Sequence, residues 1–451
     1  MNTEEEIKLK NIPTNILNLY KNKLCSADEA VKNIKSGDNV VIQPGCAVPL
    51  ELARAMVRRK DELKDVTAYH ILIVGDLPYV KPGMEKHFKH KAFFIGANTR
   101  KAVNEGRAEF IPIFLSELPL LFKQGIIKVD VALLNVSLPD EHGFCSYGVD
   151  VGTIKTAAEK SKIIIAQCNG EMPRSLGDSF IHINKIHHIV EHTEKIQELP
   201  QVDPNASKEV LDVYDKIGKN VADLIEDGAT LQMGIGAIPD CVMKYARKRK
   251  NLGIHTEMFS DGIIDLVEEG IINGEEKTLH PGKIIAGFVL GTQRVFDFID
   301  NNPVIEFHPQ EYVNDPFVIA KNKKMVAINS AIEVDLTGQV CSDSFGPKLY
   351  SGIGGQVDFI RGAAHSKGGK PVIALPSVTK DGKTSRIVSQ LRPGSGVVTS
   401  RGDVHYVITE YGTAQLFGKS IKERSRALIE IAHPDFRDEL TKYANEIIFH
   451  I

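Results

Sequence analysis

The sequence predicts an α/β protein made of two related open domains with mostly parallel sheets. Three observations lead to this prediction: short continuous apolar runs, helical patterns between them, and an internal similarity between the halves of the chain. Continuous apolar runs are typical of strands buried on both faces, as in parallel sheets covered by helices. Strands that alternate with helices indicate the α/β class. A chain of 451 residues also exceeds one usual core, so we expect two domains.

The strands are predicted from short apolar segments. These are NVVIQ (39–43), HILIVG (70–75), VDVALLNV (129–136), KIIIAQCN (162–169), KIIAGFVLG (283–291), MVAINSAI (325–332), KPVIALP (370–376) and HYVITEYG (405–412). A long helix is predicted from Lys208 onward, in KEVLDVYDKIGKNVADLIEDG, where apolar residues recur at helical spacing. Two capping boxes, Ser26 with Glu29 and Ser420 with Glu423, predict two further helix starts.

The polar segment 192–208 contains Pro200 and Pro204 and separates an apolar strand from the long helix. We therefore predict domains at residues 1–200 and 201–451.

The two halves share an order of features. Segments 34–60 and 225–250 each run from a helix end through a glycine, a strand, a glycine-containing loop and a proline into a helix with a basic end. A second similarity pairs DEHGFCSYG (140–148) with DLTGQVCSDSFG (335–346). We interpret the halves as homologous domains. Like domains often meet at a ligand-binding cleft, so we expect the active site at the domain interface.

The composition limits the classes of function. A net charge of −3 with 25% charged residues argues against nucleic-acid or polybasic membrane binding. The start MNTEEEIKLK has no apolar signal region, and no segment has the 18 apolar residues of a membrane span, so a cytoplasmic protein is expected. The six cysteines form no Cys-x-x-Cys pair and are expected to be reduced thiols. The histidines His182, His187, His188 and His192 match no zinc motif, so no metal is expected.

Three glycine-containing loops are candidate ligand contacts. The loop MGIGAIPD (233–240) leads into a helix and can hold an anion on its N–H groups, although a tight turn explains it equally well. It lacks the third glycine of the dinucleotide fingerprint. The loop SGIGGQVDF (351–359) has three glycines in four positions, which favours close approach of a ligand. The loop VTKDGKTSRIV (378–388) either meets phosphates or is simply solvated.

The catalytic candidates are carboxylates, because the chain has neither a G-x-S-x-G serine elbow nor a Walker lysine loop. They are Glu257 in HTEMFSDG, Glu333 in SAIEVDL and Glu410 in VITEYG. Glu257 and Glu410 directly follow strand-like segments, where α/β sheets place ligands. The residues alone leave the choice among them open.

The chain resembles, over nearly its full length, the acetyl-CoA hydrolase/transferase family of class I coenzyme A transferases. The resemblance is carried by SLPDEHGFCSYG, MGIGAIPD, HTEMFSDGIIDL, NSAIEVDLTGQV, SGIGGQVDFIRGA, HYVITEYG and LFGKSIKERSRALIEIAHPDFRDEL, in this order. Within the family, it is similar to members that act on 4-hydroxybutyrate or butyrate with acetate.

The resemblance implies that Glu257 attacks an acyl-CoA, forming an acyl-glutamyl anhydride and then a glutamyl-CoA thioester. It also implies that Asn314 orients this carboxylate and that Ile332 and Lys380 contact CoA. Oxyanion and CoA contacts are implied for Gly234, Ile235, Gly236, Ala237, Ile238, Gly354 and Gly355.

The remaining implications concern the rest of the site and the partners. Glu333 becomes a structural residue, and the loop 45–49 is expected to face the small carboxylic acid. CoA is the expected substrate with no further cofactor, the acids are short, and the assembly is a homodimer or homotetramer. Two alternatives stay open: an acyl-CoA hydrolase of the same family, and a non-catalytic effector-binding α/β module.

Overall fold

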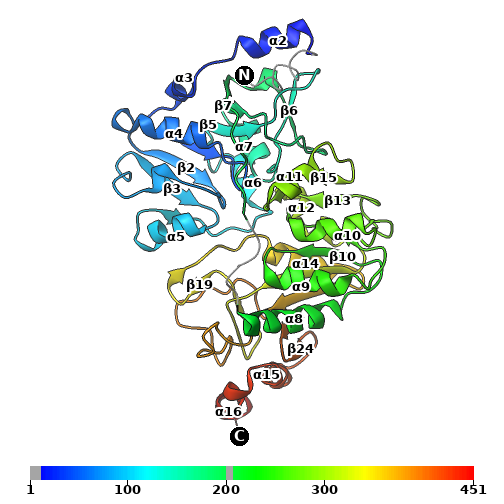
Figure 1. Ribbon diagram of the computed structural model, residues 1–451. Coiled ribbons are helices and arrows are strands. Elements are labelled where there is room, and N and C mark those ends of the chain that lie inside the picture. Colours follow the sequence, from blue (N-terminus) through cyan, green and yellow to red (C-terminus); the bar gives the residue numbers. More distant parts are fainter. Residues whose placement is uncertain (1–11, 200–206, 451) are drawn as a thin grey trace. The chain divides into compact units, whose positions relative to one another are not determined.

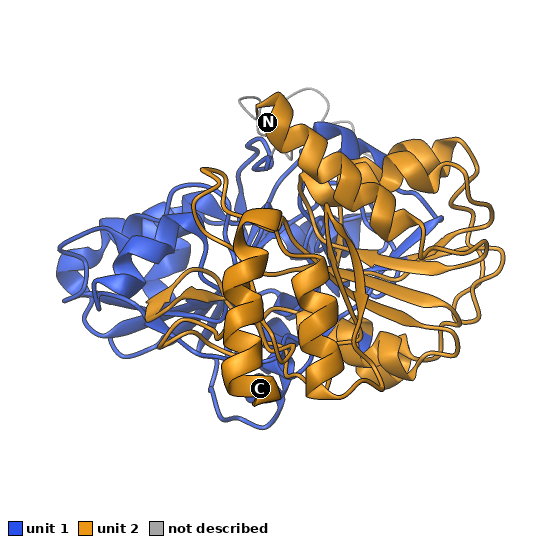
Figure 2. Ribbon diagram, turned by 90° about the horizontal axis from the view of Figure 1, so that it is seen from below, with its two compact units in different colours: residues 1–200, 285–312 blue, residues 201–284, 313–451 orange. Residues whose placement is uncertain are grey.

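The computed structural model describes residues 12–199 and 207–450. The chain folds into two compact units (Figure 2): unit 1 comprises residues 1–200 and 285–312, and unit 2 comprises residues 201–284 and 313–451. The predicted boundary near residue 200 therefore coincides with a unit boundary, but residues 285–312 group with unit 1 rather than with the second domain. The position of the active site at the domain interface stays a prediction.

Main-chain hydrogen bonds explain why residues 285–312 belong to unit 1. The Val289 N–H donates to the Val149 carbonyl at 2.8 Å. The Phe307 N–H donates to Leu176 and its carbonyl accepts from Asp178, both at 2.8 Å. This segment therefore completes the first unit although it follows part of the second in the sequence.

Unit 1 is built on a parallel sheet in the order β4-β3-β2-β1-β5-β7-β9 (Figure 1). Its strands are β1 (Asn39–Ile42), β2 (Val66–His70), β3 (Phe88–Ala92), β4 (Glu109–Phe110), β5 (Val131–Val136), β6 (Phe144–Ser146), β7 (Ile163–Cys168), β8 (Phe180–His182), β9 (His188–Glu191), β13 (Ile284–Ala286), β14 (Phe288–Val289) and β15 (Ile305–Phe307). Its helices are α2 (Thr14–Lys21), α3 (Ala27–Ala30), α4 (Leu50–Arg58), α5 (Ala97–Asn104), α6 (Leu118–Lys123), α7 (Ile154–Lys160), α11 (Gln293–Ile299) and α12 (Gln310–Val313), with 3-10 turns η1 (Val31–Asn33), η2 (Lys60–Glu62), η3 (Pro78–Val80) and η4 (Ile183–Lys185).

Unit 2 is built on a sheet in the order β11-β10-β16-β21-β23-β24, parallel except for the last pair. Its strands are β10 (Thr230–Met233), β11 (Gly253–Ile254), β12 (Met258–Phe259), β16 (Met325–Ser330), β17 (Glu333–Asp335), β18 (Val340–Cys341), β19 (Ser344–Phe345), β20 (Lys348–Leu349), β21 (Lys370–Ala374), β22 (Ile387–Val388), β23 (Tyr406–Thr409) and β24 (Gly412–Gln415). Its helices are α8 (Lys208–Ala222), α9 (Ala237–Ala246), α10 (Ile264–Glu268), α13 (Pro316–Ile319), α14 (Gln356–His365), α15 (Ile421–Glu430) and α16 (Pro434–Tyr443), with the 3-10 turn η5 (Asp261–Ile263) and the π-helix η6 (Ala444–Phe449).

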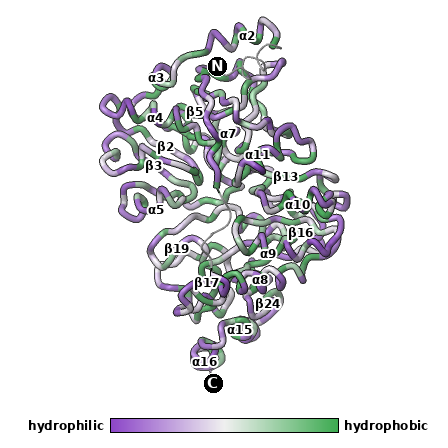
Figure 3. Tube along the Cα trace, in the orientation of Figure 1, coloured by the Kyte–Doolittle hydropathy of each residue, from purple (hydrophilic) through white to green (hydrophobic). Residues whose placement is uncertain are grey.

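The fold follows from burial of the apolar strands. Strand β5 is buried along its whole length, as are β2 and β10. Helices that follow successive parallel strands by right-handed connections must cover the faces of such a sheet. In unit 2, α8 and α9 pack side by side (Figure 1). Figure 3 shows the apolar residues gathered along the inner strands of each unit and the polar residues on the outer loops.

The two units repeat one strand order. The run β2-β1-β5-β7-β9 in unit 1 has the same order along the chain as β11-β10-β16-β21-β23 in unit 2. In each unit, the strand of this run that comes first in the sequence leads into a helix: α4 follows β1, and α9 follows β10. The α/β class with mostly parallel sheets is therefore confirmed, and the shared order agrees with the predicted duplication.

The predicted strand at 70–75 is wrong in position. Strand β2 is Val66–His70, and the apolar residues after it form an irregular segment. An isolated β-bridge between Ile73 and Gly45 pairs this segment with the loop that follows β1. Segment 283–291 is likewise not one strand, since it is divided at Gly287 into β13 and β14. Both predicted capping boxes are confirmed, at the starts of α3 and α15. Within the described residues, no helix is long and apolar enough to cross a membrane.

Candidate active site

Glu257 lies just beyond the carboxyl end of β11, between this strand and β12. Two buried hydrogen bonds hold its segment in place. The Thr256 hydroxyl donates to the carbonyl of Met233 at 3.3 Å, and Met233 ends β10 just before the first glycine loop. His255 Nε2 donates to the carbonyl of Val313 at 2.8 Å. These bonds connect the segment to the glycine loop on one side and to the residue before Asn314 on the other.

The carboxylate of Glu257 is partly buried and has two donors. Asn314 Nδ2 donates to Oε2 at 3.0 Å, and the Gly355 backbone N–H also donates to the carboxylate. Burial raises the pKa of Glu257 to about 7, and the two hydrogen bonds act in the opposite direction. A carboxyl that titrates near neutrality in a prearranged setting is typical of a catalytic group.

Position 355 must be glycine, because the Glu257 and Asn314 side chains leave no room for a Cβ atom. A Cβ at this position would lie 1.8 Å from Glu257 Oε2 and 2.3 Å from Asn314 Nδ2, so any side chain would displace both groups. Its φ of −96° is available to any residue, which means that close approach rather than backbone conformation demands glycine. Gly355 is also the N-cap of α14, whose N-terminal dipole favours a negative charge here.

Asn314 is fixed by a second carboxylate, Asp358. Asp358 Oδ2 lies 3.4 Å from the same Nδ2, and the Asp358 side chain is 3% exposed. With a carboxylate accepting on each side, the amide nitrogen rather than the oxygen faces Glu257. Sequence reasoning missed Asp358. An acidic residue in the first turn of the helix after Gly354 and Gly355 is the signal that could have identified it.

The glycine loop after β10 leaves main-chain donors accessible. Gly236 has φ +109° and ψ −176°, a conformation that strongly favours glycine, and a Cβ at Gly234 or Gly236 would meet no atom within 4 Å. Helix α9 starts at Ala237, and no described side chain caps it. Uncapped N–H groups at a helix start can bind an anion. Ile235 is 36% exposed, whereas Ile238 is buried.

The other predicted residues lie at two places in unit 2. Gly354 directly precedes Gly355, and Ile332 follows β16 at the sheet edge that carries Glu257. The end of β16 is tied to the start of α14, since Gln356 Nε2 donates to the Ser330 carbonyl at 2.8 Å. Lys380 instead lies in a separate pocket.

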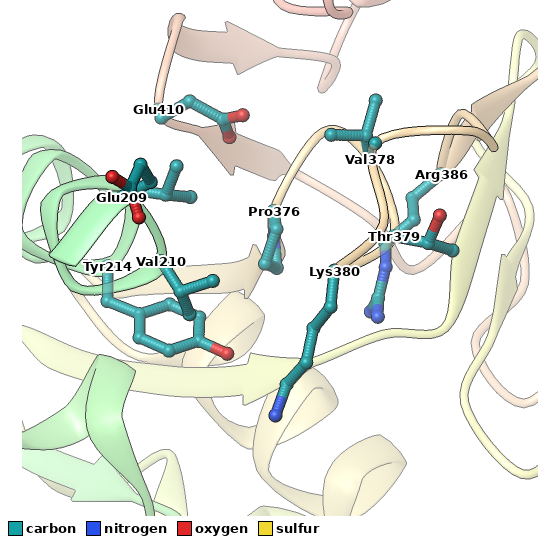
Figure 4. Close-up of a pocket in the computed structure, with 11 residues that line it drawn as sticks. Glu209, Val210, Tyr214, Pro376, Val378, Thr379, Lys380, Arg386 and Glu410 are labelled. Atoms are coloured by element: carbon teal, nitrogen blue, oxygen red, sulfur yellow. The ribbon is translucent and has the colours of Figure 1, made fainter. Parts of the chain in front are cut away.

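This pocket has a volume of about 170 Å³ and includes Lys380, Arg386, Tyr214, Glu209 and Glu410. In Figure 4 the two basic side chains come from the loop after β21, while the two carboxylates lie on the side of α8 and the end of β23. Burial lowers the pKa of Arg386, and its Nε has no hydrogen-bond partner among the described residues. A partly desolvated guanidinium favours an anionic ligand.

The rival carboxylates are held by structural hydrogen bonds. Glu333 accepts from the Arg392 N–H at 2.9 Å and forms an ion pair with the same residue at 3.2 Å. Glu410 accepts from the N–H and the hydroxyl of Ser377 at 2.9 and 2.6 Å. Neither has the setting of Glu257 against a glycine N–H and a buried amide.

The described residues contain no group of three or more His, Cys, Asp or Glu side chains placed to hold a metal ion. The histidines noted in the sequence lie on β8 and around β9, with His182 and His187 lining one pocket of unit 1.

Comparison with known proteins identifies the family. Residues 13–200 match the acetyl-CoA hydrolase/transferase N-terminal domain and residues 291–444 match the C-terminal domain. The chain is 51% identical over 422 residues to 4-hydroxybutyrate coenzyme A transferase of Clostridium kluyveri, covering 94% of this chain and 97% of that one. It is 37% identical to butyryl-CoA:acetate CoA-transferase of Anaerostipes caccae, covering 95% and 97%.

A solved structure agrees with these sequence matches. The crystal structure of 4-hydroxybutyrate CoA-transferase from Porphyromonas gingivalis superposes with a TM-score of 0.82 at 41% identity, covering 96% of this chain and 100% of that one. These relatives favour an enzyme over an effector-binding module. The chain belongs to the acetyl-CoA hydrolase/transferase family and is an enzyme of the CoA-transferase type.

Proposed function

We propose that the enzyme transfers coenzyme A between a short acyl-CoA, 4-hydroxybutyryl-CoA or butyryl-CoA, and acetate. The observation that carries this proposal is the setting of Glu257: a carboxylate with a pKa near neutrality, held by a buried amide and by the N–H of a glycine that has no room for a side chain. The substrates are inferred from the names of the relatives, 4-hydroxybutyrate coenzyme A transferase and butyryl-CoA:acetate CoA-transferase.

In the first half of the proposed reaction, an oxygen of Glu257 attacks the thioester carbonyl carbon. The new C–O bond forms, the C–S bond breaks, and CoA leaves as the thiolate, which gives an acyl-glutamyl anhydride. The thiolate then attacks the glutamyl carbon. A C–S bond forms, the anhydride C–O bond breaks, and the first acid leaves as its carboxylate. In the second half, acetate attacks the glutamyl-CoA thioester, and CoA leaves as the thiolate. The thiolate then attacks the acetyl carbon of the new anhydride, which gives acetyl-CoA and frees Glu257. The whole cycle neither consumes nor releases a proton.

The contacts of Glu257 suit the second attack in particular. When the thiolate adds to the glutamyl carbon, negative charge develops on the glutamyl oxygen, and Asn314 Nδ2 and the Gly355 N–H already point at this carboxyl group. Donors placed before the charge appears are the usual basis of oxyanion stabilisation. The free N–H groups of the loop 234–238 would serve the other oxyanion, on the substrate acyl group.

The pocket around Lys380 and Arg386 is proposed to bind part of CoA. Its volume of about 170 Å³ is below that of a site for a whole drug-sized ligand, so it fits one phosphate or ring and its neighbours. Binding energy from such a remote contact can be used to place the thioester against Glu257. CoA then acts as substrate and transient adduct, and the proposal includes no further cofactor.

The test is to incubate the protein with 4-hydroxybutyryl-CoA or butyryl-CoA and acetate, and to measure acetyl-CoA. Borohydride reduction during turnover should label Glu257 through its thioester, which peptide mass spectrometry detects. The Glu257→Ala variant should lose transfer and labelling, whereas Glu430→Gln, which removes an exposed carboxylate at the end of α15, should keep both. Full activity in Glu257→Ala would reject the mechanism.

Hydrolysis of acyl-CoA is the alternative, because the family description includes hydrolases. Free CoA is measured with and without acetate. Release of CoA at the same rate in both conditions, with no acetyl-CoA formed, identifies a hydrolase; acetyl-CoA formed in proportion to the acyl-CoA consumed identifies the transferase.

A further inference from the structure

Unit 1 contains two fully buried polar side chains, Asp150 and Gln310, that have no hydrogen-bond partner in the described part of the chain. Each residue is 0% exposed, and both carboxyl oxygens of Asp150 and both amide atoms of Gln310 are unpartnered among the described residues. Burying polar groups without partners is costly, and most buried polar atoms in proteins are paired. Two such side chains together therefore indicate a polar group that occupies the space between them.

Glycines bring the two side chains together. A Cβ at Gly152 would lie 3.0 Å from Gln310 Oε1 and 3.4 Å from Asp150 Oδ1, so a single group at that point would touch both. A Cβ at Gly45 would lie 3.3 Å from the other carboxyl oxygen of Asp150. The two carboxyl oxygens of Asp150 therefore each lie next to a glycine, Gly152 on one side and Gly45 on the other.

The main chain that carries the pair is held firmly. Gln43 Nε2 donates to the carbonyls of Tyr147 and Asp150, both at 2.9 Å and both buried. The Gln310 N–H donates to the Gly152 carbonyl at 3.1 Å. The main chain at both residues is therefore fixed by hydrogen bonds within unit 1.

The charge of the pair selects the chemistry of its ligand. No lysine or arginine in the described ranges pairs with Asp150, and burial raises the pKa of this carboxyl well above its usual range. A protonated carboxyl offers one O–H donor and an acceptor oxygen, and a carboxamide offers two N–H donors and an acceptor oxygen. A ligand hydroxyl group, which is both a donor and an acceptor, can form a hydrogen bond with the Asp150 carboxyl and with the Gln310 amide. A ligand carboxylate would instead be an uncompensated buried charge.

We propose that Asp150 and Gln310 form a site that recognises the hydroxyl group of a short hydroxycarboxylic acid or of its acyl group. The proposal rests on the proposed function and deepens it, because it assigns the enzyme a preference for a hydroxyacyl-CoA over the unsubstituted acyl-CoA and over a dicarboxylic one.

The experiment compares kcat/KM for 4-hydroxybutyryl-CoA and butyryl-CoA, with acetate as acceptor, in the full chain. The wild type should prefer the hydroxyacyl substrate. Asp150→Leu and Gln310→Met should lower the preference at least about tenfold, since one hydrogen bond to the hydroxyl is lost and its partner is left unpaired. Asp150→Asn keeps a donor and an acceptor and should retain the preference.

Thr399→Val is the matched control. The Thr399 hydroxyl is also buried and unpartnered among the described residues. Its main chain pairs with Val340 of β18, and the residue belongs to neither the Glu257 site nor the Asp150–Gln310 pair, so its removal should leave the preference unchanged. If Asp150→Leu fails to fold by circular dichroism, Gln310→Met decides. An equal loss for both substrates in these variants means that the pair holds only a structural water, which overturns the proposal; so does a wild type without preference.

A second readout separates this proposal from the proposed function. A wild type that transfers CoA from neither substrate refutes the proposed function. In that case thermal stabilisation by free 4-hydroxybutyrate and by butyrate at equal concentrations is compared. Greater stabilisation by the hydroxy acid, lost in Gln310→Met, supports the hydroxyl site, and equal stabilisation by the two acids rejects it.

Discussion

Replacing Glu257 by glutamine should stabilise the protein at alkaline pH and not at acid pH. The variant keeps the shape of the side chain but removes its ionisation. Burial raises the pKa of Glu257 in the folded protein from 4.5 to about 7. The unfolded chain therefore loses this proton first as pH rises. The free energy of unfolding of the wild type must then fall between pH 4.5 and pH 7, and the variant lacks this loss.

The magnitude follows from the displacement of the pKa. Each pKa unit corresponds to about 1.4 kcal/mol, so a displacement from 4.5 to about 7 amounts to roughly 3 kcal/mol once both states are ionised. For a cooperative unit of some 200 residues this corresponds to a rise in Tm of roughly 6 to 12 °C at pH 8. Near pH 4 the carboxyl is protonated in both states, and the pH-dependent difference vanishes.

The assay is thermal unfolding of Glu257→Gln and wild type without CoA, between pH 4 and pH 8. The difference between the two proteins at each pH cancels the titration of all other groups. Glu430→Gln, which removes an exposed carboxylate at the end of α15, controls for the change in net charge. A difference in Tm that stays constant from pH 4 to pH 8 would refute the reasoning, because it would show that Glu257 titrates alike in both states.

Three further predictions concern the same unit. In Asn314→Leu the pKa of Glu257 should rise further, because a hydrogen-bond donor to its carboxylate is lost. The rising limb of the kcat/KM–pH profile should then move to higher pH, and an unmoved limb would contradict the role of Asn314 as this donor. Gly355→Ala should lower kcat at least about 100-fold with little change in Tm, since a Cβ 1.8 Å from the carboxylate oxygen displaces it, whereas Gly402→Ala, with only a hydroxyl at 3.5 Å, should be near wild type. Lys380→Ala should raise KM for acyl-CoA about tenfold with kcat nearly unchanged, measured at two salt concentrations; an effect on kcat alone would place Lys380 outside the CoA site.

Much of the fold was predictable because both sheets bury continuous apolar strands. Segments 129–136 and 162–169 contain β5 and β7, and the boundary near residue 200 follows from a polar segment with two prolines. Strand β3 was missed, since its sequence FKHKA is largely polar and alternates between buried and more exposed positions. The return of residues 285–312 to unit 1 was also missed, because it depends on long-range main-chain bonds that no local pattern encodes.

Only part of the candidate active site could be predicted from the sequence. Glu257 was a candidate from its place after a strand-like segment, but the residues alone did not distinguish it from Glu333 and Glu410. The difference lies in tertiary contacts. Glu333 and Glu410 accept bonds that fix loops, whereas Glu257 meets an amide and a helix N-terminus. Asp358 lies in the segment SGIGGQVDF, in the first turn of α14, but its contact with Asn314 becomes visible only in the folded chain.

The repeated strand order lets one half of the molecule be compared with the other position by position. Asn39 of β1 is paired with Thr67, and its counterpart Thr230 of β10 is paired with Gly253. Four residues further along each partner segment stand Ile71 and Glu257. The same topological position thus holds a buried isoleucine in one copy and the proposed nucleophile in the other. Under the predicted duplication, the proposed reactive carboxylate therefore belongs to only one of the two copies.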